Sequence, residues 1–154
     1  MRLFQPKRFV LSLLVIPLLM AETIAFSQQS DSYKGDDLHY LGYIMLTGDT
    51  SAWANVKNDD IYYLSKSLFL KKQANLKFIK NDDLYFFGIA LITGKKEDLD
   101  KIEKDDYYYL GTALFEKKDS SLENIKTDDL YYLGKGLLTR DSKYFDEIST
   151  EKAE

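Results

Sequence analysis

The chain has no cysteine, and it has only one histidine and two prolines among its 154 residues. Without thiols it forms no disulfide and carries no lipid-modified cysteine, so packing alone must hold the fold together. The one imidazole, that of His39, argues against a Ser-His-Asp triad and cannot form a multi-histidine metal site. Neither a Gly-rich phosphate-binding motif nor an EF-hand loop occurs. We therefore expect no enzyme activity and no cofactor.

Long apolar runs are also scarce, and the one that is present lies near the N-terminus. It reads "FVLSLLVIPLLM" (residues 9–20) and follows a basic stretch. Twelve residues are too few to span a bilayer comfortably, and Pro17 interrupts them. Ala25 and Ser27 place small residues where a signal peptidase cuts. We expect residues 1–27 to be a cleaved signal peptide, with an uncleaved membrane anchor as the alternative, and hence a periplasmic or secreted protein.

Basic side chains are fewer than acidic ones once the predicted signal peptide is removed. The remaining chain has 18 basic and 24 acidic side chains, a net charge of −6. Nucleic acids and anionic membranes are bound through cations, so neither is an expected partner, and no stable membrane insertion is expected after signal cleavage. The charge suits a protein or peptide partner that is itself basic.

What the sequence does contain is a repeat. The stretch "DDLYYLG" (residues 128–134) recurs with small changes at intervals of 23 residues. After a lead-in at 28–35, the five repeats occupy residues 36–58, 59–81, 82–104, 105–127 and 128–150, followed by a tail at 151–154. A fixed period of this length is the signature of a repeat architecture.

Each repeat begins with the pattern of an amphipathic helix. Counted from zero at the first Asp, positions 2, 5, 9 and 10 are apolar and position 6 is small, which is helical spacing. The first Asp is expected to cap the helix, and the second to face the positive end of its dipole. The small residue at position 6 lets another helix approach. We predict a helix from position 0 to about position 11, ended by Gly48 and Gly94 in two of the repeats.

A second, shorter helix follows in each repeat. Positions 17 and 20 are apolar, as in Leu76 and Ile79, which indicates two turns of helix that are partly 3₁₀. Neither helix can bury its apolar face alone, so the repeats must stack. The expected fold is all-α, an α-solenoid of five helix-turn-helix repeats with one longer and one short helix each.

Two of these segments resemble a known class of repeats. "YYLGKGL" (residues 131–137) and "YYLGTAL" (residues 108–114) are similar to the Leu-Gly core of tetratricopeptide and Sel1-like helical repeats. Those families repeat at about 34 residues, so the 23-residue period here implies a truncated second helix. The resemblance implies a scaffold that binds other proteins.

Tyrosine is more abundant than a core of this size requires. Position 3 is His39 or Tyr and position 4 is Tyr or Phe in every repeat. We expect position 3 to pack between neighbouring helices, against small residues at position 8. Positions 4 and 7 are expected to point away from the second helix and to line a partner-binding groove. These candidate residues are Tyr40, Tyr43, Tyr63, Lys66, Phe86, Ile89, Tyr109, Thr112, Tyr132 and Lys135. The alternative is that the rings only cover the helices.

The function expected from these features is that of an exported bacterial protein-binding scaffold, either an adaptor or an inhibitor (immunity protein) of a partner enzyme. A small-ligand or metal-associated envelope protein, an enzyme of unknown class that uses His39 or the repeated aspartates, and a purely structural spacer stay open as alternatives. Catalysis needs one special site, whereas the Asp pair recurs in all five repeats and has a structural explanation.

Overall fold

The computed structural model describes residues 35–148, and all regular structure within that range is helical. Five longer α-helices, α1 to α5, alternate with five short helices, four of them 3₁₀ and the last, α6, an α-helix, so the predicted all-α repeat fold is confirmed. The signal peptide, the lead-in and the C-terminal tail lie outside the described residues. The elements are α1 (Gly35–Thr47), η1 (Thr50–Asn55), α2 (Asp59–Leu70), η2 (Gln73–Phe78), α3 (Asp82–Thr93), η3 (Lys96–Lys101), α4 (Asp105–Glu116), η4 (Asp119–Asn124), α5 (Asp128–Thr139) and α6 (Lys143–Asp146).

The predicted helix lengths agree closely with the structure. Helices α2 to α5 begin at the first Asp of their repeats and end at position 11. The second helix is a six-residue 3₁₀ helix in the first four repeats and a short α-helix, α6, in the last. Gly48 and Gly94 end their helices with positive φ angles of 76° and 71°. Lys71, Lys117 and Arg140 take the same left-handed conformation in the other repeats, with φ between 52° and 58°.

The expected role of the first Asp is wrong, because the capping residue is the one before it. Asn58 accepts a hydrogen bond from the backbone N–H of Ile61 at 3.1 Å, and Asn81 accepts one from that of Leu84 at 3.0 Å. An N-cap residue needs extended backbone angles, and Asn58 and Asn81 have them. The first Asp is therefore already inside the helix, where its charge interacts with the dipole.

The second Asp ties each repeat to the next. Its carboxylate accepts hydrogen bonds from backbone N–H groups 20 or 21 residues later, in the turn that leads to the following α-helix. Asp60 accepts from Lys80 at 2.9 Å and from Asn81 at 3.1 Å. Asp37, Asp83 and Asp106 make the corresponding bonds. These donors would otherwise have no partner in the turn, which explains an acidic residue at this position in the first four repeats.

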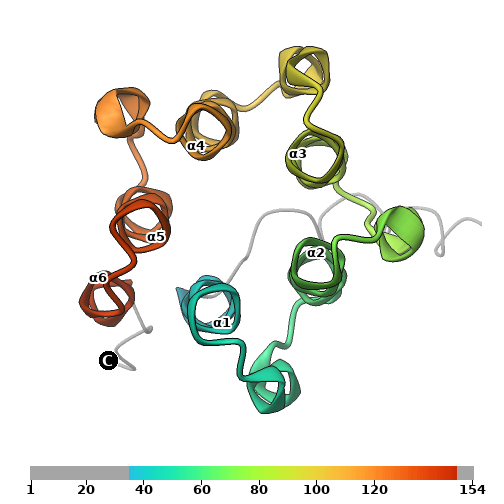
Figure 1. Ribbon diagram of the computed structural model, residues 1–154, viewed down its shortest axis with the longest axis vertical. Coiled ribbons are helices and arrows are strands. Elements are labelled where there is room, and N and C mark those ends of the chain that lie inside the picture. Colours follow the sequence, from blue (N-terminus) through green and yellow to red (C-terminus); the bar gives the residue numbers. More distant parts are fainter. Residues whose placement is uncertain (1–34, 149–154) are drawn as a thin grey trace, which may run out of the picture. The chain divides into compact units, whose positions relative to one another are not determined.

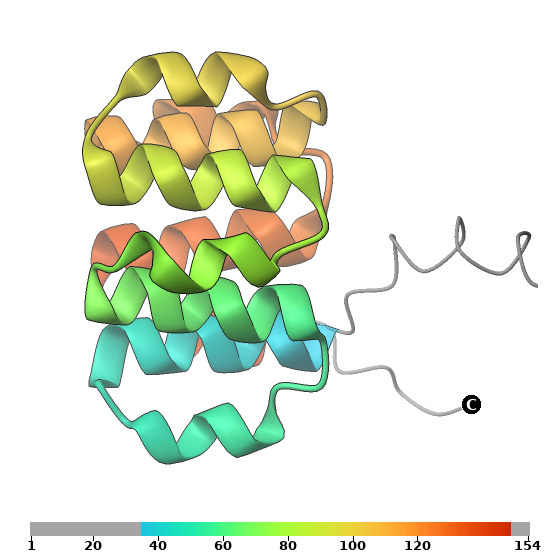
Figure 2. The same ribbon diagram turned by 90° about the vertical axis from the view of Figure 1, so that its right-hand side faces the viewer.

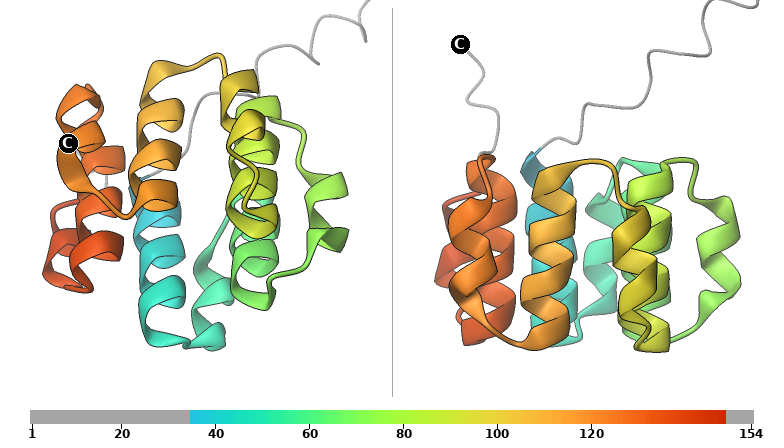
Figure 3. Two further views of the ribbon diagram at one scale, coloured as in Figure 1. Left: turned by 45° about the horizontal axis from the view of Figure 1, so that its top comes forward. Right: turned by 90° about the horizontal axis from the view of Figure 1, so that it is seen from above.

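The five α-helices form a closed ring. Each contacts its neighbours along the chain, and α1 also contacts α5 and α6 (Figure 1). The short helices lie outside this ring, each packed on its own α-helix and, in repeats 2 to 4, on the next one. The helices run side by side with their connecting loops gathered at two edges (Figures 2 and 3). The repeats stack as expected of a solenoid, but the array returns to its start.

The seam between the last and first repeats is sealed by Phe145 of α6. This side chain is 1% exposed, and its ring lies against both Gly42 of α1 and Gly136 of α5. A Cβ atom at Gly42 would lie 2.6 Å from the Phe145 ring. His39 also joins the seam, because its Nδ1–H donates to the Phe145 carbonyl oxygen at 2.9 Å. The only histidine of the chain thus has a structural partner 106 residues away.

The apolar stripe of each α-helix faces the ring interior and the two neighbouring α-helices. Position 6 meets the preceding repeat: a Cβ atom at Gly88 would lie 2.9 Å from Leu64 and 2.7 Å from Leu76. This confirms that a small residue is needed there for close approach. Residues at positions 2 and 5 are at most 6% exposed in all five repeats. Because the short helices lie on the outside, the opposite face of each α-helix, which carries positions 2 and 9, points inward.

Candidate binding surface on the outer face

Positions 4 and 7 lie on the outer face of each α-helix, between two short helices. The expectation that position 4 points away from the second helix of its repeat is wrong. Tyr63 packs on Phe78 of η2, with ring centroids 4.9 Å apart, and Lys101 of η3 lies 5.1 Å from the ring of Phe86. Position 7 faces the preceding short helix instead, as Lys66 Nζ lies 5.3 Å from the Trp53 ring of η1.

The short helices therefore divide the predicted residues among successive strips of the outer face. Each strip lies between the short helix of the preceding repeat and that of its own repeat (Figure 1). One strip holds the predicted residues of one repeat, such as Tyr63 and Lys66, and the short helices separate it from the next strip. Nine of the ten predicted residues are half-buried, whereas Thr112 is buried and its Oγ1 has no hydrogen-bond partner.

Positions 3 and 4 form an edge-to-face aromatic pair in every repeat. In all five pairs the ring centroids are 5.3 to 5.6 Å apart and the ring planes are inclined by 70° to 87°. This arrangement places the positive edge of one ring on the negative face of the other, which is favourable. The pairs are His39–Tyr40, Tyr62–Tyr63, Tyr85–Phe86, Tyr108–Tyr109 and Tyr131–Tyr132.

Repeat 2 extends its pair into a longer row. From η1 to η2 the side chains follow in the order Trp53, Lys66, Tyr62, Tyr63, Phe78 and Lys77, and we call these six residues the repeat-2 row. Lys66 Nζ lies 4.4 Å from the Tyr62 ring centroid and donates a hydrogen bond to the Tyr62 hydroxyl at 2.5 Å. Lys77 Nζ lies 4.9 Å from the Phe78 ring. An ammonium group at such a distance over an aromatic face is attracted to the ring, and this attraction stabilises the contact.

Phe78 was not among the residues predicted from the sequence, although the sequence contains a signal for it. It occupies position 19, where the other repeats have Asn55, Lys101, Asn124 and Glu147. Phe78 is 47% exposed, and Leu70 on the outer face of α2 is 45% exposed. A position that is polar in every other repeat is expected to be exposed, so an apolar residue there indicates an exposed apolar site. The sequence prediction considered only the positions that keep the same residue type in all repeats, and it therefore missed Phe78.

Ion pairs on the outer face connect successive repeats. Lys96 at the start of η3 pairs with Glu116 at the end of α4 at 2.6 Å, which raises the pKa of Lys96 and lowers that of Glu116. Lys135 pairs with Asp119 of η4 at 3.1 Å, and this hydrogen bond raises the pKa of Lys135. Exposed pairs of this kind contribute little to stability. The second pair shows that Lys135, at position 7 of repeat 5, already has an ion-pair partner within the chain.

The repeated carboxylates are engaged as well. Burial alone would raise the pKa of Asp106, but the hydrogen bonds donated by Lys126 and Thr127 outweigh it and hold the pKa below its ordinary value. No group of three or more carboxylate or imidazole side chains within residues 37–148 is arranged to hold a metal ion. The geometry of the second aspartates is accounted for by the turns that they hold.

Taken together, the fold and this surface define an all-α helical-repeat protein whose outer face carries one aromatic pair per repeat. No protein-family model, curated protein or solved structure matches the chain. None of the helices in the described range has the length and apolar character needed to cross a membrane.

Proposed function

We propose that this protein is an exported, protein-binding helical-repeat scaffold of tetratricopeptide-like or Sel1-like character. It acts as an adaptor or as an inhibitor (immunity protein) of a partner enzyme. The binding surface is the outer face of the ring, where the predicted residues at positions 4 and 7 lie between the short helices.

One observation carries this proposal. The aromatic pairs at positions 3 and 4 are half-buried on the outer face, where rings such as Phe86 and Tyr132 pack on the core cluster and keep part of their surface exposed. Partly exposed aromatic side chains, here presented at a regular interval, are among the residues that most often anchor protein interfaces. A ring whose neighbouring helices seal one another also provides a rigid support, which lowers the entropic cost of binding.

The experiment uses the triple variant Tyr63→Ala, Phe86→Ala, Tyr109→Ala as bait in a pull-down from native extracts, beside the unchanged chain. The proposal expects one or more partners to be captured by the unchanged chain and lost by the variant. The melting temperature should fall by only a few degrees, because these side chains lie outside the ring interior. A matched control, Thr47→Ala with Thr139→Ala, changes two exposed positions on the same face and should keep the partner.

Capture that survives the triple substitution would overturn the proposal. So would the absence of any partner for the unchanged chain after crosslinking in intact cells, since a spacer without a partner would behave in that way. Loss of a measurable activity in His39→Ala with the fold intact would instead support the alternative of an enzyme.

A further inference from the structure

We propose that the repeat-2 row is the docking site for an acidic segment of a partner protein that also carries an apolar anchor. This inference rests on the proposed function and adds to it the place of binding and the chemistry of the partner.

Repeat 2 differs in charge from the other four repeats. Residues 59–81 hold five lysines and two aspartates, a net charge of +3, whereas each of the other repeats has a net charge of −2. From residue 61 to residue 81 there is no acidic side chain. The net charge of the chain conceals this basic repeat. The local field at a docking site selects the partner, so the charge of repeat 2 favours an acidic segment there.

The same repeat has the exposed apolar surface that an anchor needs. Leu70 and Phe78 are the large apolar side chains identified as exposed in the described part of the chain, and both belong to repeat 2. Leu70 lies on the same face of α2 as Tyr63 and Lys66, which precede it by seven and four residues. The aromatic and aliphatic side chains provide apolar contacts for an anchor residue of a partner, and the lysines beside them provide cations for a neighbouring carboxylate.

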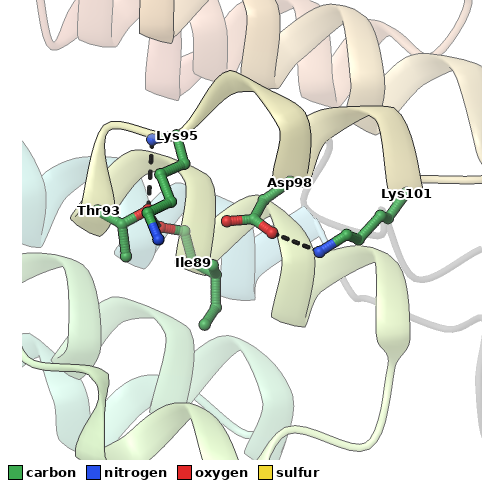
Figure 4. Close-up of polar contacts among 5 residues, drawn as sticks. All are labelled: Ile89, Thr93, Lys95, Asp98 and Lys101. Carbon is green, nitrogen blue, oxygen red and sulfur yellow. Dashed lines mark hydrogen bonds and ion pairs between the residues drawn. The ribbon is translucent and has the colours of Figure 1, made fainter.

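Repeat 3 shows how the equivalent surface is closed elsewhere. Position 19 in repeat 3 is Lys101, which lies over the Phe86 ring. Lys101 also pairs with Asp98 at 2.6 Å (Figure 4). The hydroxyl of Thr93, bonded to the Ile89 carbonyl oxygen, helps to order the turn before η3 in the same view. In repeat 3 the carboxylate of Asp98, which belongs to the same chain, thus pairs with the Lys101 ammonium group. Repeat 2 has Asn75 at the position of Asp98, so it lacks this carboxylate, and a carboxylate of a partner can take that place beside Lys77.

The extent of the basic surface argues for a short peptide segment over a nucleic acid. Nucleic acids bind along stripes of cations that neutralise many phosphates. Here one basic repeat lies between repeats with a net charge of −2, which would repel a polyanion longer than a single repeat. A short acidic segment with one apolar side chain needs only the length of the row.

The experiment selects ligands for the full chain without its leader from a random dodecapeptide display library. The expected consensus has two or more Asp or Glu residues beside Phe, Leu or Trp. The consensus peptide is then synthesised with Phe in place of any Trp. Binding is followed through the emission of Trp53, the only tryptophan of the chain, which belongs to the row.

The variant Lys77→Glu with Phe78→Asn should weaken binding of this peptide at least tenfold. It gives η2 the residue types that repeat 4 has at Glu123 and Asn124, so the fold should tolerate it. The matched control is Lys126→Glu, which also reverses one lysine but does so at a position where repeat 3 already has Glu103. It should leave the affinity within about twofold, and raising the salt concentration should weaken binding to the unchanged chain.

Several results would overturn the inference. They are a basic consensus, no consensus at all, equal binding by the Lys77/Phe78 variant, or tighter binding of a single-stranded oligothymidine than of the peptide. A peptide lost by the Tyr63/Phe86/Tyr109 variant but kept by the Lys77/Phe78 variant would overturn this inference alone. The proposed protein-binding function would then stand.

Discussion

At the scale of the residue, the second aspartate of each of the first four repeats holds the chain where it turns into the next α-helix. Asp60 and Asp106 each accept two backbone N–H groups from that turn. Sequence reasoning placed both aspartates of the pair at the helix start and assigned them to capping and the dipole. It missed these hydrogen bonds because the backbone donors lie 20 and 21 residues after the aspartate, and a local sequence pattern does not indicate contacts at that separation.

We predict that Asp106→Asn lowers the free energy of unfolding by about 1–2 kcal/mol at pH 7, since an amide oxygen cannot replace both carboxylate oxygens as acceptors. The pKa of Asp106 is lowered in the folded state, so its contribution is present above the ordinary value near 3.8 and is lost as the pH falls through the folded pKa. Urea unfolding at pH 6 and near pH 3 should therefore show the difference from the unchanged chain shrinking in acid.

The control for this prediction is Asp105→Asn, at the first aspartate of the same pair. Asp105 is exposed and interacts with the helix dipole, so its substitution should cost only about 0.3–1 kcal/mol. Equal losses from the two substitutions, or a difference at Asp106 that does not change with pH, would contradict the assignment of the tie.

At the scale of the element, the side chains of α6 and of its neighbours are matched in size. Repeats 3 and 4 combine an alanine at position 8 with a leucine at position 17, namely Ala90 with Leu99 and Ala113 with Leu122. Repeat 5 combines Gly136 with Phe145. A Cβ atom at Gly136 would overlap the Phe145 ring, most severely at Cε1, so the larger ring requires the smaller partner.

We predict that Gly136→Ala destabilises the protein by about 1–3 kcal/mol, because a rigid ring cannot yield to the added methyl group. Adding Phe145→Leu should recover at least part of that loss, since the pair then matches repeats 3 and 4. Denaturant unfolding of the two single variants and the double variant measures the coupling. Additive losses, with no recovery in the double variant, would show that the two side chains do not compete for the same space.

At the scale of the whole repeat array, periodicity alone anticipated most of the architecture. The helix boundaries, the 3₁₀ character of the second helix and the need for Gly88 and its equivalents followed from a 23-residue pattern, because these properties are local or involve adjacent repeats. Closure does not follow from that pattern. It depends on the small rotation between successive repeats, which is set by side-chain volumes across every interface. In hindsight the pairing of Phe145 with Gly136 is a departure from repeats 3 and 4 that lies at the seam.

The packing of the short helices also changed the candidate site. Positions 4 and 7 were expected to line one groove away from the second helix, whereas the structure places them on the outer face between the short helices. The surface that binds a partner is then a property of single repeats, and differences between repeats matter more than their shared columns. The positive charge of repeat 2 and its exposed Leu70 and Phe78 are such a difference.

The most direct measurement is a set of distances between spin labels, which the absence of native cysteines makes simple. Labels at exposed position 11 are introduced pairwise as Thr47→Cys with Leu70→Cys (α1 and α2), Thr47→Cys with Thr139→Cys (α1 and α5), and Leu70→Cys with Thr139→Cys (α2 and α5). A closed ring with its outer face at position 11 predicts nearly equal distances for the first two pairs and a longer one for the third. A distance between α1 and α5 that exceeds both others would mean an open array and would contradict the account.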